Sequence, residues 1–175
     1  MATFTLSVTD DAYVYTGGPT QNLGSNSALN IAYTGGSARV YMRAPSFTVP
    51  AGEVVTSATL RIWAGSGATN VPVAFYKVTS AWSESGVTWE RQPSFEYVKT
   101  ITKTVSTGAT VNEFDITNAF DAEHGLMMTA DPLRVSVAFR SAEYGTASQR
   151  PQIIIETAPG VITPPPFRGW GIPAL

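Results

Sequence analysis

The chain has 175 residues, a formal net charge of −2 and only 14% charged residues, so it offers no basic field for binding nucleic acid. It has no cysteine and a single histidine, His124, which excludes thiol catalysis and metal sites built on cysteine or paired histidines, and disfavours Ser-His-Asp hydrolysis. The length fits one domain, and 15 glycines with 12 prolines are typical of an all-β protein with many turns.

Alternating apolar and polar residues begin at Thr3–Val8 and recur at residues 58–64, 71–76 and 133–140. Glycine- and proline-containing turns separate these segments. About ten short strands arranged in this way predict a jelly-roll-like antiparallel β-sandwich. The alternation predicts that six residues face its core: Leu60, Ile62, Val135, Val137, Phe139 and Ile153.

One short helix is predicted at Thr117–His124, with Asp115 or Thr117 capping its start and Gly125 at its end. The strand pattern starts at the first residues, and no basic or apolar leader precedes it, so no signal peptide is expected in this chain. No window approaches the length of apolar sequence that a membrane span needs.

The composition changes near Ala158, and the sequence predicts a β-sandwich domain over residues 1–157 followed by an extended arm over residues 158–175. Five of the 12 prolines lie in this arm, and Pro164–Pro166 favours a polyproline conformation. The arm is expected to be the main element that docks on a neighbouring subunit, and the alternative is that it folds back over an edge strand of its own sandwich. The predicted partner-binding residues are Phe167, Arg168, Trp170, Ile172 and Leu175.

Several stretches occur in an order and spacing that resemble a known family. They are Asp11–Val14, Asn22–Leu29, Arg39–Arg43, Val49–Gly52, Val55–Ile62, Val78–Trp89, Gln92–Ser94, Phe114–Thr117, Phe139–Ser141 and Gln149–Ile153. Together they resemble the DNRLRE domains, which are related to a family of carbohydrate-binding modules. The resemblance covers about residues 10–157 and implies a jelly-roll sandwich without catalytic activity. Such domains occur on secreted enzymes, on cell-surface proteins and in bacteriophage structural proteins.

Four aromatic residues are candidates for contact with a glycan or another surface. Trp82 and Trp89 bracket a loop rich in serine and glutamate, where packing is favoured over a sugar platform because an indole buries a large area. Trp63 and Tyr76 are predicted to share a polar strand face, which is either an interaction surface or an ordinary solvent face. Arginines expected at such polar strand positions are Arg61, Arg134 and Arg140.

Carboxylates near predicted turns are Asp10, Asp11, Glu84, Glu90, Asp115 and Glu143. Capping and turn chemistry is the favoured interpretation of these residues. A calcium ion is the one cofactor considered, with Asp11 as the best single ligand candidate. No pair of residues has a recognisable acid–base motif, so no catalytic residue is assigned and no enzyme is expected.

The favoured function is a non-enzymatic structural protein of a bacteriophage virion, such as a capsid decoration or minor subunit, that docks on other subunits and on copies of itself. The absence of a leader, of an attached catalytic domain and of cysteine favours this interpretation, as does the apolar arm. The alternative is a carbohydrate-binding or adhesive module of a secreted or cell-surface protein. The corresponding locations are the virion, or otherwise the extracellular space or cell surface.

Overall fold

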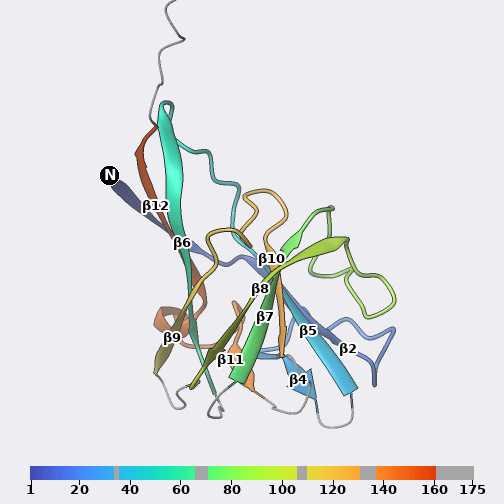
Figure 1. The fold of residues 1–175 in the computed structure, drawn as a ribbon. Helices are drawn as coiled ribbons and strands as arrows, with labels where there is room; N and C mark the ends of the chain where they lie inside the picture. Colours follow the sequence, from blue (N-terminus) through green and yellow to red (C-terminus); the bar gives the residue numbers. More distant parts are fainter. Residues whose placement is uncertain (34–35, 66–70, 106–109, 131–136, 161–175) are drawn as a thin grey trace, which may run out of the picture.

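A computed structural model describes residues 1–33, 36–65, 71–105, 110–130 and 137–160, and the regular secondary structure in these ranges is almost entirely β-strand (Figure 1). The strands are β1 (Ala2–Ser7), β2 (Asp10–Tyr15), β3 (Ala28–Asn30), β4 (Ala32–Tyr33), β5 (Gly36–Arg43), β6 (Glu53–Trp63), β7 (Val71–Val78), β8 (Phe95–Lys103), β9 (Val111–Asp115), β10 (Leu126–Ala130), β11 (Ala138–Arg140) and β12 (Gln152–Pro159). One 3₁₀ turn, η1 (Ala147–Gln149), precedes β12. Within the described ranges, no helix is long and apolar enough to cross a membrane.

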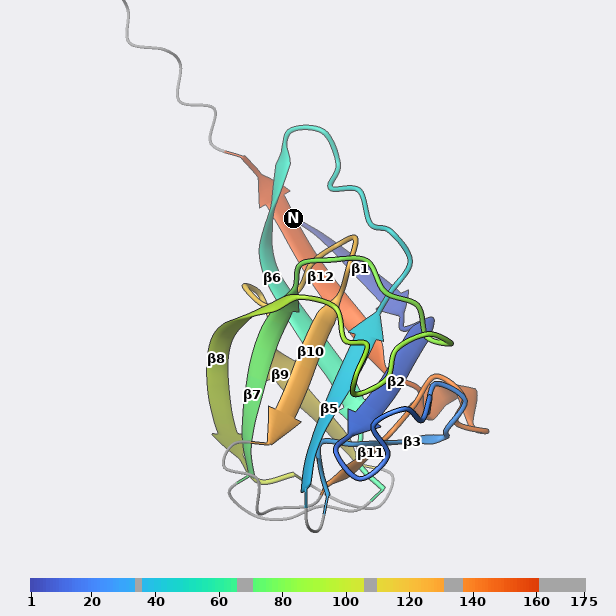
Figure 2. The ribbon, with the colours of Figure 1, turned by 90° about the vertical axis from the view of Figure 1, so that its right-hand side faces the viewer.

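Two antiparallel sheets form the layers of a sandwich, which confirms the predicted all-β fold class (Figure 2). The smaller sheet has the strand order β1-β12-β6-β9, and the larger has the order β2-β5-β10-β7-β8 with β4 paired to β5. Strands β3 and β11 form a separate antiparallel pair. Neighbouring strands are often distant in sequence, so the sandwich depends on non-local pairing.

The main core lies between the two sheets, where apolar side chains from both inner faces meet. Phe75 on β7 contacts Phe114 on β9 at 5.5 Å between ring centroids, and Phe114 contacts Phe139 at 6.2 Å. Five residues that the alternation places in the core are buried there: Leu60, Ile62, Val137, Phe139 and Ile153. Val135, the sixth, lies outside the described residues.

The predicted helix at Thr117–His124 is wrong, because this segment forms two successive turns instead. Asp115 Oδ1 accepts hydrogen bonds from the backbone N–H and the hydroxyl of Thr117, at 3.0 and 2.6 Å. Asp121 Oδ1 accepts from the backbone N–H of His124 at 2.8 Å. Short acidic side chains that bond to nearby backbone N–H groups stabilise turns in competition with a helix. Gly125 follows with a φ of 78°, a left-handed conformation that suits glycine.

The last strand, β12, continues to Pro159, and the Gly160 N–H donates to the Gly52 carbonyl at 2.8 Å. The predicted arm beyond this point, with Phe167, Arg168, Trp170, Ile172 and Leu175, lies outside the described residues. Docking through the arm therefore stays a prediction.

We expect Leu60→Ala to lower the free energy of unfolding by about 2–5 kcal/mol, because Leu60 is fully buried between the sheets and its truncation leaves a cavity. Val54→Ala on the same strand is the matched control, since Val54 is 51% exposed. Denaturant unfolding of both variants measures the difference. Equal effects of the two substitutions would contradict the assignment of the core.

Candidate functional site

The outer face of the larger sheet also carries a row of apolar and aromatic side chains. Strand register aligns Ala12, Tyr41, Met127, Tyr76 and Tyr97 in one row across β2, β5, β10, β7 and β8. The first three of these residues have no exposed area. A second cluster of buried residues therefore lies on this face, and another part of the chain must cover it.

The cover is the connection between β7 and β8, residues 79–94, which crosses in front of β10 and β5 in Figure 2. Trp82 packs on Tyr41 with ring centroids 5.7 Å apart, and its Nε1–H donates to the His124 carbonyl at 2.9 Å. Val87 is buried in the same cluster. Trp82 thus has the contacts of a packing residue, and a glycan contact by its ring stays a prediction.

Arg39 on β5 lies between two aromatic rings at the end of this connection. Its guanidinium is 4.7 Å from the Trp89 ring centroid and 5.0 Å from that of Phe95. Gln92 Oε1 accepts hydrogen bonds from Arg39 and from the Tyr41 hydroxyl, both at 2.8 Å. Burial raises the pKa of Tyr41, so its phenol remains a neutral donor. These contacts hold the Arg39 side chain in one orientation.

The aromatic contacts continue along the sheet and reach solvent at Tyr97. Tyr76 makes edge contacts with Phe95 and with Tyr97, each at 5.4 Å between ring centroids. Tyr97 is 59% exposed, while Trp89, Phe95, Tyr76 and Arg39 are half-buried. We call these five residues the aromatic strip. Sequence reasoning missed Phe95 and Tyr97, although their two-residue spacing places both side chains on one face of a strand.

A hollow of about 330 Å³ lies within the connection. Trp82, Val87, Arg91 and Gln92 are among its lining residues. Gln92 also accepts the hydrogen bond from Arg39, so the hollow and the aromatic strip are neighbours. Their combined surface offers ring faces, a guanidinium and an amide.

Trp63 lies on the other side of the molecule, and the prediction that it shares a face with Tyr76 is wrong. Trp63 belongs to β6 in the smaller sheet and Tyr76 to β7 in the larger one. Arg61 lies over the Trp63 ring at 5.5 Å from its centroid and 3.7 Å from Glu113 Oε1. Alternation correctly predicts that Trp63 and Tyr76 each point away from the core, but their strands belong to different sheets.

Two further arginines are predicted at polar strand positions, and Arg140 is the one that the structure describes. The Arg140 guanidinium lies 4.3 Å from the Tyr144 ring centroid and donates to Gln149. Arg134 lies outside the described residues. Arg140 is therefore engaged locally, next to the end of β11.

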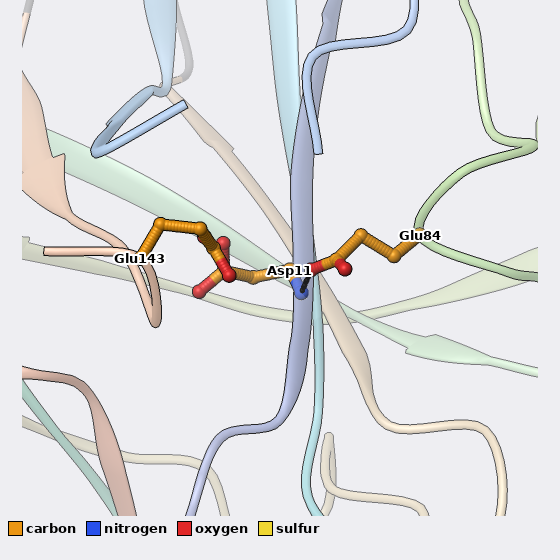
Figure 3. A group of neighbouring side chains, drawn as sticks. All are labelled: Asp11, Glu84 and Glu143. Atoms are coloured by element: carbon orange, nitrogen blue, oxygen red, sulfur yellow. Dashed lines mark hydrogen bonds between the residues drawn. The ribbon is translucent and has the colours of Figure 1, made fainter. Parts of the chain in front are cut away.

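Three of the predicted carboxylates come together from distant parts of the chain: Asp11, Glu84 and Glu143 (Figure 3). One oxygen from each lies within 4.8 Å of the others. Burial raises the pKa of Asp11 to about 8, and the charges of Glu143 and Glu84 act in the same direction, against a hydrogen bond from Ala142 that lowers it. Burial also raises the pKa of Glu84. We call these three residues the carboxylate cluster.

The other candidate carboxylates make ordinary surface interactions. Asp10 forms an ion pair with Arg43 at 3.0 Å, and Glu90 is exposed. Asp115 bonds to Lys99 at 2.6 Å, and this bond is the largest contribution that lowers the pKa of Asp115 to about 2. Asp115 also bonds to the backbone N–H of Thr117, which fits the turn interpretation of the sequence, while the sequence does not predict the ion pairs with Arg43 and Lys99.

The fold and the aromatic strip define an all-β sandwich module with aromatic side chains along the outer face of its larger sheet. A family model, carbohydrate-binding module family 96, matches residues 2–157, and the chain belongs to that family. No curated protein matches the chain in sequence. The relationship to carbohydrate-binding modules implied by the resemblance is therefore confirmed, although the DNRLRE name is not.

Membership of a family of binding modules agrees with the expectation of a non-enzymatic protein. It also favours the alternative function over the virion interpretation, which none of these findings supports. A virion role stays a prediction.

We expect Trp82→Ala to lower the free energy of unfolding by about 2–4 kcal/mol, because it uncovers the buried outer face and removes the hydrogen bond to His124. Trp82→Phe, which keeps most of the packing, should cost about 1 kcal/mol. Denaturant unfolding separates the two variants. Full stability of Trp82→Ala would contradict a covering role for the connection.

Proposed function

We propose that this module binds a glycan without catalysis, through the aromatic strip and the adjoining hollow. The observation that carries the proposal is the exposure of Tyr97 at the end of a continuous series of ring contacts on one sheet face. Family membership supports the same function.

The chemistry of the strip suits a sugar. The C–H faces of a pyranose ring are apolar and pack against aromatic rings, while its hydroxyls need hydrogen-bond partners. Tyr97 and Trp89 supply ring surface, and Gln92 and Arg91 supply polar groups in the adjoining hollow. Arg39 is already fixed by two rings and Gln92, so little side-chain entropy is lost when a ligand binds.

We expect Tyr97→Ala and Trp89→Ala each to weaken glycan affinity about tenfold or more, equivalent to about 1.4 kcal/mol of binding free energy. Electrophoresis in gels that contain neutral or acidic polysaccharides identifies a retained polymer, and calorimetry with its oligosaccharide measures the affinity. Trp63→Ala is the matched control, because Trp63 is a tryptophan on the opposite sheet. It should bind as the unmodified chain does.

Two outcomes would contradict this proposal. One is that no polysaccharide in the panel retains the unmodified protein. The other is that Trp63→Ala reduces the affinity while Tyr97→Ala and Trp89→Ala leave it unchanged.

We further propose that the arm, when a partner is present, docks on neighbouring protein subunits, as the virion interpretation requires. Its support is the sequence alone: polyproline residues restrict the free chain, and Phe167 and Trp170 are suitable anchors. A chain that ends at Gly160 keeps the bond to Gly52 and should melt as the full chain does, but lose its assembly in light scattering after size exclusion. A lower melting temperature with new self-association would indicate fold-back instead, and unchanged assembly would exclude docking through the arm.

A further inference from the structure

Asp11, Glu84 and Glu143 are brought together by three separate elements. Asp11 lies on β2, Glu84 in the connection between β7 and β8, and Glu143 in the segment after β11. In Figure 3 the two glutamates approach the aspartate from opposite sides. Backbone hydrogen bonds set this arrangement: Glu84 Oε1 accepts from the Asp11 N–H at 2.9 Å, and Asp11 Oδ2 accepts from the Ala142 N–H at 2.7 Å.

Two oxygens of the cluster are buried without a hydrogen-bond partner. Asp11 has no exposed area, and its Oδ1 has no partner. Glu143 Oε2 is also buried and has no hydrogen-bond partner. A buried carboxylate oxygen without a partner is costly unless a cation or a proton satisfies it.

Among the described residues, Arg43 is the positive charge that lowers the pKa of Glu84, but its hydrogen bonds go to other groups. Its guanidinium donates to Asp10 at 3.0 Å and to the Trp82 carbonyl at 3.3 Å, and lies 5.3 Å from the Trp82 ring centroid. It lowers the pKa of Glu84 only weakly compared with the burial that raises it. The cluster therefore has negative charge that these contacts do not neutralise.

We infer that Asp11, Glu84 and Glu143 hold a calcium ion. The three side chains offer only oxygen atoms, the ligands that hard cations prefer. Calcium takes oxygens at 2.3–2.6 Å, so its opposite ligands lie about 4.6–5.2 Å apart, which accommodates a cluster that spans up to 4.8 Å. Opposite ligands of magnesium lie only about 4.0–4.2 Å apart, and magnesium demands near-octahedral geometry.

The ion would join Asp11 to Glu84, 73 residues away, and to Glu143, 132 residues away (143 − 11) in sequence. It would stabilise the folded chain, because the separated residues of an unfolded chain do not form the site. Calcium binding is independent of any glycan, so its test does not depend on the proposed function.

The alternative is a shared proton. Asp11 and Glu143 could satisfy their free oxygens as a carboxylic acid bonded to a carboxylate. Asp11→Asn imitates the protonated form, so under this alternative the variant is at least as stable as the unmodified chain and neither responds to calcium.

The test uses the full chain after treatment with EDTA. We expect 1 mM CaCl₂ to raise the melting temperature by about 5 °C and MgCl₂ to raise it less. Calorimetry should show calcium affinity at least about tenfold weaker in Asp11→Asn and in Glu143→Gln. Glu113→Gln is the charge-matched control and should respond fully, because Glu113 lies on β9 beside Arg61, on the opposite sheet.

Terbium luminescence gives a readout that needs no variant. Trp82, two residues from Glu84, should sensitise bound Tb³⁺, and calcium should displace the signal. Absence of both the thermal shift and the sensitised emission would overturn the calcium site. So would an unchanged calcium response in both Asp11→Asn and Glu143→Gln.

Discussion

Burial of the central strands of the larger sheet on both faces, at β5 and β10, is the constraint on which the rest of the structure depends. Its inner face packs against the smaller sheet, and its outer face carries Tyr41 and Met127, which have no exposed area. A two-layer sandwich covers only one face of each sheet, so the connection between β7 and β8 must cover the other. Trp82 and Val87 pack on this outer face. The need to cover it determines the path of the connection across the sheet.

The aromatic strip and the carboxylate cluster are held by the same connection. Near its start, Glu84 bonds to the Asp11 N–H, and the Asn22 side chain donates to the carbonyls of Glu84 and Val87 at 2.6 and 2.9 Å. Near its end, Gln92 accepts from Arg39. A cation at the cluster would therefore stabilise the segment that also carries Trp89. The proposed ligand face and the proposed ion site are mechanically linked through this connection.

Sequence patterns predict the parts of this structure that depend on local periodicity. Alternation places Leu60 in the core because successive strand residues point to opposite faces. It does not say which sheet a strand joins, so it groups Trp63 with Tyr76 wrongly. At residues 117–124, acidic side chains bond to nearby backbone and turns replace the predicted helix. Asp11 can be chosen as a ligand candidate, but its two partners are too distant in sequence for spacing to identify them.

The most direct test of the central claim is an NMR titration of the isotope-labelled full chain with an oligosaccharide of the retained polymer. Chemical shifts report which surface the ligand contacts. Glycan binding through the aromatic strip predicts the largest changes at the Trp89 indole N–H and at the backbone amides of Arg39 and Tyr97, with the Trp63 indole unchanged. Changes confined to Trp63 and its neighbours on the smaller sheet, or to residues after Gly160, would contradict it.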